Sequence, residues 1–501
     1  MPVDVLSPET PAYADTKARV RTARIVATVS GLLGMLLALA VPFLPVRQEA
    51  ATVSWPQGSD LTNIEAPLVS YAPLELRASV PCSAFPLLGD EGGTLISTVP
   101  PDAPDATENA LVIRTVPGTD GGPAAMEVVL RNSVVVSAPI DDEHRCTAVT
   151  VATNADRTAA EIVGLGQHDD GHHIATLDGD HRPQMVGVYS DLQGSAQALT
   201  SGPDAERLSV RAALDSRFTS TPTLVKFVAM LVCILATLLS LVALHRLDGV
   251  DNRRARRILP AHWWRFTAVD AVVVGTLLLW HVIGANTSDD GYILTMARAS
   301  DEAGYMANYY RWFGVPEAPF GWYYDVLVLL AKISTASVWM RLPALLAAIA
   351  CWMVISREVI PRLGVAVRRN RIALWTAGLV FLAFWLPYDN GLRPEPVIAL
   401  GALLTWCSIE RAVATGRMLP AAIAVLLAAF SLAAGPTGLI AVAALVAGAR
   451  PVLVRLVGRR RLVGVVPPLA AILAAGTVVL VVVFADQTLA SVLEATRVRS
   501  A

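Results

Sequence analysis

The chain has 501 residues, of which 54% are hydrophobic and only 16% are charged, and its mean hydropathy is +0.51. Soluble globular proteins carry about 25% charged residues, and several apolar runs here approach the ~20 residues that span a bilayer. The composition therefore excludes an ordinary soluble protein and predicts a polytopic membrane protein. The formal net charge of −2 argues against a nucleic-acid partner, and none is expected.

The first part of the chain predicts a tail followed by a membrane anchor. Residues 1–24 are polar and end in basic residues, which indicates a cytoplasmic tail. The apolar run 25–46 follows. The tripeptide Ala38-Leu39-Ala40 resembles a signal-peptide cleavage site, but the apolar stretch continues to Pro45. We therefore favour an uncleaved first transmembrane helix over residues 25–46.

Basic residues gather in the short segments between apolar runs. By the positive-inside rule, such segments face the cytoplasm. The clearest examples are Arg246, Arg253, Arg254, Arg256 and Arg257, and later Arg357, Arg362, Arg368, Arg369 and Arg371.

Residues 47–218 have a different pattern from the rest of the chain. Short β-branched runs, as at 110–115, 127–130 and 146–151, are separated by Asp-, Gly- and Pro-rich turns. This spacing predicts an extracytoplasmic β-sandwich inserted between the first two spans. Cys82 and Cys146 both lie in this region, and an oxidising compartment predicts a disulfide between them.

A run of histidines and aspartates in the same region suggests a metal site, because imidazole and carboxylate groups ligate zinc or calcium. The spacing matches no recognised ligand pattern, so a solvated loop is the favoured interpretation, and the metal stays unknown. The run comprises His168, Asp169, Asp170, His172, His173, Asp178, Asp180 and His181.

Residues 219–501 predict a membrane domain with about eight further spans, nine in all. The fold class expected is therefore a polytopic α-helical membrane protein with an inserted β-sandwich. Residues 286–337 form an external segment whose dense aromatic residues are typical of anchoring at a membrane interface. The expected spans after the first are 224–243, 268–285, 338–355, 371–387, 397–409, 420–434, 439–449 and 465–485.

Two charged loops are predicted on the same extracytoplasmic face. Asp289 and Asp290 directly follow an apolar span, and Arg393 and Glu395 lie in the loop after another. Carboxylates at the edge of an apolar medium are costly, which indicates function. A carboxylate can deprotonate a hydroxyl, and an arginine can hold a phosphate leaving group through two oxygens. The alternatives are a solvated Asp-Gly turn and a snorkelling arginine.

Several long strings resemble the mycobacterial arabinosyltransferases that are targets of ethambutol. The similarity extends from the first span to Ala501. The strings that carry it are 286–298 (NTSDDGYILTMAR), 304–314 (GYMANYYRWFG), 316–324 (PEAPFGWYY), 339–343 (WMRLP) and 390–395 (NGLRPE).

The resemblance implies a GT-C-type glycosyltransferase. Its donor would be decaprenyl-phosphoryl-arabinose, its acceptor the arabinan of arabinogalactan or lipoarabinomannan, and its reaction an inversion at the anomeric carbon. The implied site is at the extracytoplasmic face of the plasma membrane, and a homo- or heterodimer with a paralogue is implied. No cofactor is certain, although a divalent cation is compatible with this chemistry. The resemblance assigns catalysis to Asp289 and Asp290, with Asp289 as base. It assigns acceptor or inhibitor binding to Tyr292, Ile293, Met296, Asn308 and Glu317.

The resemblance also implies that the β-region is carbohydrate-binding-like and that the family continues beyond this chain. Family members complete the cavity with later residues, including a histidine near the donor phosphate. The chain thus resembles the N-terminal half of such an enzyme. Two other functions are weighed: a non-catalytic scaffold that binds glycan, and a transporter. A transporter would place ionisable residues near the midplane of its helices, whereas the carboxylates here lie at span ends.

Overall fold

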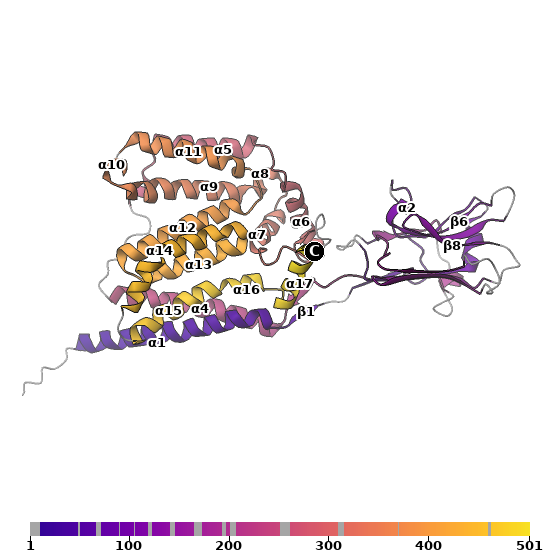
Figure 1. Ribbon diagram of the computed structural model, residues 1–501, viewed down its shortest axis with the longest axis horizontal. Coiled ribbons are helices and arrows are strands. Elements are labelled where there is room, and N and C mark those ends of the chain that lie inside the picture. The colour runs from indigo at the N-terminus through magenta and orange to yellow at the C-terminus, as the bar shows by residue number, and fades with distance from the viewer. Residues whose placement is uncertain are drawn as a thin grey trace, which may run out of the picture. The chain divides into compact units, whose positions relative to one another are not determined.

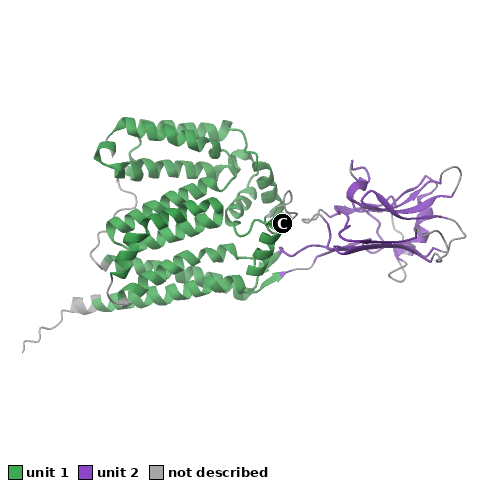
Figure 2. Cartoon of the chain, in the orientation of Figure 1, with its two compact units in different colours: residues 1–47, 220–310, 315–501 green, residues 48–219, 311–314 purple. Residues whose placement is uncertain are grey.

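The structure, a computed structural model, forms two compact units (Figure 2). Unit 1 comes from described residues within 1–47, 220–310 and 315–501, and unit 2 from those within 48–219. Unit 2 is therefore inserted in the sequence between the first two long helices of unit 1. The described residues are 11–48, 51–66, 72–89, 91–104, 106–118, 123–140, 146–164, 173–192, 197–200, 207–250, 261–308, 315–368, 370–458 and 462–500.

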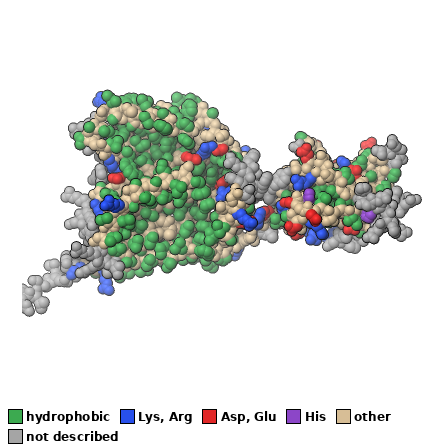
Figure 3. Space-filling model, in the orientation of Figure 1, with side chains coloured by type: hydrophobic (Ala, Val, Ile, Leu, Met, Phe, Trp, Pro, Cys, Tyr) green, Lys and Arg blue, Asp and Glu red, His purple; other side chains and the backbone are tan. Residues whose placement is uncertain are grey.

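Unit 1 is a bundle of apolar helices (Figure 1). Among the described residues, seven helical segments are long and apolar enough to cross a membrane. Many of their Leu, Ile and Val side chains are exposed, and Figure 3 shows an almost wholly hydrophobic middle with charges near the ends. The long segments contain α1 (Pro11–Ala40), α4 (Leu224–Val250), α9 (Leu342–Val354), α11 (Arg371–Asp389), α12 (Glu395–Thr415), α14 (Leu439–Val457) and α15 (Leu462–Thr477).

Shorter helices complete unit 1. Two expected spans are 16-residue helices, α5 (Ala268–Ile283) and α13 (Leu419–Ala434). At 1.5 Å per residue, each is about 24 Å long, which is less than the ~30 Å hydrocarbon core. The others are α6 (Asp290–Ala303), α7 (Trp322–Ala331), α8 (Ser337–Met340), α10 (Val365–Arg368), α16 (Val479–Val483) and α17 (Leu489–Ser500).

The first helix is longer than predicted. It begins at Pro11 rather than at residue 25, so the expected tail is helical from that residue onward. Proline is well suited to a helix start, and residues 12–24 contain good helix formers and neither proline nor glycine. Hydropathy identifies only the apolar part of a helix, so it does not distinguish the polar first turns of α1 from a tail. The helix ends before a 3₁₀ turn that contains Pro42.

Arg357, from one of the basic segments expected to face the cytoplasm, is buried in an ion pair. Its guanidinium makes two hydrogen bonds of 2.8 Å to the carboxylate of Asp270, and the two side chains are 6% and 0% exposed. The indole N–H of Trp352 donates to the same carboxylate over 2.9 Å. Because the pair is bidentate and further hydrogen-bonded, its burial between α5 and α9 is tolerated. Arg357 therefore joins two helices.

Unit 2 is a sandwich of two antiparallel sheets. One sheet has the strand order β11-β10-β9-β4-β13-β2, and the other has the order β5-β6-β7-β8. The strands of the larger sheet are β2 (Thr52–Trp55), β4 (Glu75–Pro81), β9 (Ala148–Asn154), β10 (Arg157–Val163), β11 (Ile174–Asp178) and β13 (Ser209–Ala213). Those of the smaller sheet are β5 (Gly93–Ser97), β6 (Leu111–Val116), β7 (Ala125–Leu130) and β8 (Ser133–Pro139).

Alternation along the strands fills the space between the two sheets. Leu76, Ala78 and Val80 of β4 are buried in the same core as Ile113 of β6 and Val128 of β7. The residues between them on β4 point to the outer face, as the period of two requires. The short pair of β3 (Ile64–Glu65) with β12 (Gly187–Val188) and the helices α2 (Ala106–Asn109) and α3 (Gln197–Thr200) also belong to unit 2. A separate short pair, β1 (Val46–Gln48) with β14 (Ser220–Pro222), lies where the sequence passes from one unit to the other.

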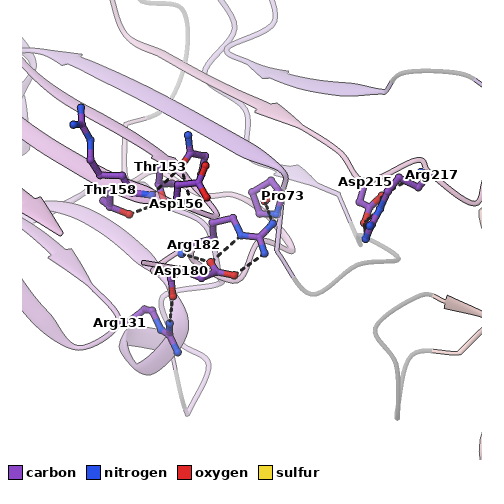
Figure 4. A network of polar contacts seen from close by, with 11 residues as sticks. Pro73, Arg131, Thr153, Asp156, Thr158, Asp180, Arg182, Asp215 and Arg217 are labelled. Carbon is purple, nitrogen blue, oxygen red and sulfur yellow. Dashed lines mark hydrogen bonds and ion pairs between the residues drawn. The ribbon is translucent and has the colours of Figure 1, made fainter. Parts of the chain in front are cut away.

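Covalent and polar links add to this core. Cys82 and Cys146 form a disulfide across 64 residues, which in the chain-entropy treatment is worth ~4 kcal/mol. At the edge of the sandwich, Arg182 donates to Asp180 and to the carbonyl of Pro73, and Arg131 donates to the carbonyl of Asp180 (Figure 4).

Candidate active site at one end of unit 1

Asp290 begins α6, and its carboxylate holds the turn before that helix. The hydroxyl of Thr287 donates to Oδ1 over 2.6 Å, and the backbone N–H of Thr287 donates to Oδ2 over 3.0 Å. A third donor, the backbone N–H of Leu392, lies 2.9 Å from Oδ1 and comes from the loop between α11 and α12. Asp290 is only 4% exposed. Three donors offset the desolvation of its charge, so Asp290 fixes the position of the loop.

Asp289 differs sharply from its neighbour. It occupies the N-cap position of α6 but makes no capping hydrogen bond with its side chain. Its carboxylate instead forms an ion pair with Arg393, and the two side chains are 25% and 36% exposed, respectively. Of the two adjacent carboxylates, Asp289 is therefore the one that a bound molecule could reach.

Two more contacts hold the residues that follow α5. Asn390 donates from Nδ2 to the carbonyl of Ala285, and Arg341 donates from Nη1 to the carbonyl of Gly284 over 3.0 Å. Sequence reasoning placed the two charged loops on one face but could not show that they meet. In the structure, the residues after α5 and the residues after α11 are joined directly, so Asp289, Asp290 and Arg393 lie together.

Polar atoms around this junction lack partners among the described residues. They include Oε2 of Glu395, Nε of Arg393, the hydroxyl of Tyr323, both carboxylate oxygens of Asp389 and Oδ1 of Asn390. Glu395 is the first residue of α12, and Tyr323, on α7, is 1% exposed. Burial raises the pKa of Tyr323, and the carboxylates of Glu395 and Asp290 add to the increase. Unsatisfied buried polar groups are costly, and they suit a site that receives a polar ligand.

Tyr323 is a residue that sequence reasoning missed. It belongs to the aromatic segment that was assigned mainly to interfacial anchoring, yet the structure buries it in a core with Met340 and Leu392. Composition alone does not distinguish a buried tyrosine from an interfacial one. The only signal was its position, six residues after Glu317 in the sequence.

Glu317 is held by the last helix described in the chain. Oε2 of Glu317 accepts a hydrogen bond of 3.3 Å from Nη1 of Arg499, and Arg499 also donates to the carbonyl of Ala318. The segment around Glu317 pairs with that around Asn308 through β15 (Ala307–Asn308) and β16 (Val315–Pro316). The side chain of Asn308 lies outside the described residues. Figure 1 places α6, α7, α8 and α17 at the same end of unit 1.

The three residues assigned to inhibitor binding are not equivalent. Ile293 is 1% exposed and Met296 is 0% exposed, and both pack with residues of α7 and α12. Tyr292 is half-buried against the same core. Ile293 and Met296 thus fix the position of α6, whereas Tyr292 retains accessible surface.

The described residues form no cluster of metal ligands. Among the described residues, no group of three or more His, Cys, Asp or Glu side chains could hold an ion. Of the histidine- and aspartate-rich run, His168, Asp169, Asp170 and His172 lie outside the described residues. A cavity of about 830 Å³ between α9, α12 and α13 has mainly apolar walls and includes Arg362, away from the Asp289 junction.

Comparisons with known proteins agree with this architecture. Residues 47–217 match the family described as "Arabinosyltransferase concanavalin like domain". "Probable arabinosyltransferase B" of Mycolicibacterium smegmatis is 52% identical over 489 residues, which are 96% of this chain and 44% of that protein. "Probable arabinosyltransferase C" of Mycobacterium tuberculosis H37Rv is 50% identical over 499 residues, which are 97% of this chain and 44% of that protein.

A solved structure extends the likeness to three dimensions. The cryo-EM structure of arabinosyltransferase EmbB from Mycobacterium smegmatis superposes with a TM-score of 0.81 at 52% identity, and the match covers 96% of this chain and 46% of that one. The prediction of a helical membrane protein with an inserted β-rich domain is confirmed. The chain spans less than half the length of these relatives. Because residues 221–501 match the family described as "Mycobacterial cell wall arabinan synthesis protein", the chain belongs to that family.

Proposed function

We propose that this chain carries the base and the donor-phosphate contact of an arabinosyltransferase. In this reaction, arabinofuranose passes from decaprenyl-phosphoryl-arabinose to a hydroxyl of cell-wall arabinan at the extracytoplasmic face of the plasma membrane. The single observation that carries the proposal is the accessible Asp289–Arg393 ion pair beside the buried Asp290. A base and a phosphate-binding cation are the two charges that such a transfer needs.

The proposed step is a single displacement. The acceptor oxygen bonds to the anomeric carbon, and its proton passes to the carboxylate of Asp289. The bond between that carbon and the phosphate oxygen breaks, and the electron pair leaves with the lipid phosphate. One attack from the side opposite the leaving group inverts the anomeric centre.

Arg393 couples donor binding to the base. In the structure, the guanidinium is paired with Asp289, and its Nε has no partner among the described residues. A phosphate offers more acceptor oxygens than one carboxylate, and arginine binds phosphate in a bidentate manner. Donor binding would draw Arg393 toward the phosphate and free Asp289 to accept the proton. Asp290 keeps the loop of Leu392 in place throughout.

The remaining assignments are part of the same proposal. Glu317 and Asn308 would line the acceptor side, Tyr292 would lie in the region that binds the inhibitor, and Glu395 would belong with Arg393 to the donor-phosphate loop. A dimer with a paralogue stays a prediction. A non-catalytic scaffold that binds glycan is the second candidate, because the carboxylate of Asp289 is already paired with Arg393.

The test is a transfer assay on the 501-residue chain in membranes, with labelled lipid-phosphate arabinofuranose and an arabinan oligosaccharide. We expect D289N to lower kcat by about 10²- to 10⁴-fold, the usual contribution of a general base. D301N is the matched control, because Asp301 lies on the same helix, is 56% exposed and pairs with Lys332. If the unaltered chain binds arabinan without transfer, these 501 residues act as a scaffold. If D289N and D301N transfer equally, Asp289 is not the base.

A further inference from the structure

The outer face of the larger sheet of unit 2 carries two arginines directly opposite each other. Arg77 on β4 is in register with Arg211 on the neighbouring β13. Both side chains are exposed. Like charges opposite each other across a pair of strands destabilise a sheet. An anion between them would remove that penalty.

Small residues flank the arginines and leave space beside them. In the same register row, Ser54 of β2 lies next to Arg211, and Ala152 of β9 lies next to Arg77. The adjacent row places Ser209, Ser79 and Thr150 in line across three strands. Apart from the two arginines, the paired residues named in these rows on β2, β4, β9 and β13 have short side chains.

These residues line a cavity of about 650 Å³, within the usual range of 300–1,000 Å³ for small-ligand sites. Trp55, Pro56 and Gly58 line another part of it, and Arg207 contributes a third arginine. None of the described lining residues is acidic. The carboxylate of Glu75 lies 4.0 Å from the guanidinium of Arg77 and is itself 57% exposed.

The lining favours a saccharide over a nucleic acid. The hydroxyls of Ser54, Thr150 and Ser209 can each donate and accept, which matches sugar hydroxyls. Single-stranded nucleic acids require aromatic faces on which bases stack. The ring of Trp55 is unsuitable because the residue is 1% exposed and its N–H is engaged with the carbonyl of Thr62.

We propose that this groove of unit 2, lined by Arg77, Arg207 and Arg211, binds a glycan that carries a negative group. The arginines hold a phosphate or a carboxylate, and the serine and threonine hydroxyls hold the adjacent sugar. This assignment does not depend on the transfer reaction proposed for unit 1, because it uses different residues and requires no donor.

The experiment measures binding by the 501-residue chain in lipid nanodiscs. Three probes separate the possible charges: an oligogalacturonate for carboxylate, a phosphomannan oligosaccharide for phosphate and a neutral arabinan oligosaccharide. We expect at least one anionic probe to bind more tightly than the neutral one, with an affinity that falls as salt rises. The double variant R77Q/R211Q should weaken that binding by about 10- to 100-fold, as expected for losing charged hydrogen bonds.

Two variants control for charge and for folding. R157Q removes an arginine that lies on the same face of the same sheet but outside the groove, where it is opposite Asp178. This variant should bind the anionic probes as tightly as the unaltered chain. R77K/R211K keeps both charges and should retain part of the affinity. Because R77Q/R211Q relieves repulsion, its thermal midpoint should not fall. Any of three results would overturn the proposal. The three probes could bind equally, R157Q and R77Q/R211Q could lose the same affinity, or neither anionic probe could bind.

Discussion

Asp289 and Arg393 form an ion pair although 104 residues separate them in the chain. The pair closes the junction between the residues after α5 and the residues after α11. Both partners retain accessible surface, in contrast to Asp290, whose carboxylate is enclosed by three donors. The neighbouring aspartates therefore have separable roles, which mutation can distinguish.

The Asp289–Arg393 pair should behave as one functional unit. We expect R393Q to raise the KM for the lipid-phosphate substrate and to lower kcat by about 10²- to 10³-fold. This is the usual effect of removing one hydrogen-bond donor that stabilises the transition state. The double variant D289N/R393Q should lose less than the product of the two single losses, because each residue acts through the other. R298Q, an exposed arginine of α6, is the control. Strictly multiplicative losses would show that the two residues act independently.

Asp290 should matter for stability more than for chemistry. In D290N, the amide oxygen can still accept a hydrogen bond, but the NH₂ group would face one of the donors of Thr287 and could not accept from it. We therefore expect the free energy of unfolding to fall by about 1–3 kcal/mol. The measurement is the urea midpoint of protease resistance in unit 1. A variant with unchanged stability and no transfer would instead make Asp290 a second reacting carboxylate.

Met296 should respond as a core residue. It is 0% exposed, so M296A should cost about 2–5 kcal/mol, whereas M296L, of similar volume, should cost less than about 1.5 kcal/mol. Thr295 is the neighbouring control, since its hydroxyl only donates back to the carbonyl of Gly291. If M296A left the thermal midpoint unchanged but altered ethambutol binding, Met296 would be a ligand contact rather than a core residue.

Asp180 should give unit 2 a small acid-dependent loss of stability. The hydrogen bonds from Arg182 lower the pKa of Asp180 below its usual 3.8. A lowered pKa stabilises the fold above pH 3.8, and that contribution is lost as the pH falls through the folded value. The side chain of Asp180 is 51% exposed, so the effect should be below about 1 kcal/mol. Urea midpoints of unit 2 measured from pH 6 to pH 3 should fall more steeply for the unaltered chain than for D180N.

Local sequence patterns are sufficient to predict the class of the protein, because hydropathy and strand alternation are local properties. Apolar runs predict the helices of unit 1. Alternating β-branched residues around 110–115 and 146–151 predict the strands that the structure shows as β6 and β9. Local patterns did not predict that α1 begins in the polar segment at Pro11. They also could not distinguish a basic residue in a loop from Arg357, which is buried against Asp270.

The composition of the candidate site depends on how distant segments of the chain pack together. Asp289 and Asp290 are identical side chains in adjacent positions, and no sequence pattern predicts that one is enclosed by Thr287 and Leu392 while the other faces Arg393. Likewise, Arg77 and Arg211 are 134 positions apart by number, and strand register alone places them opposite each other. Such pairings depend on how distant segments pack, because hydrogen bonds and charge pairs act over a few ångströms in space and not along the chain.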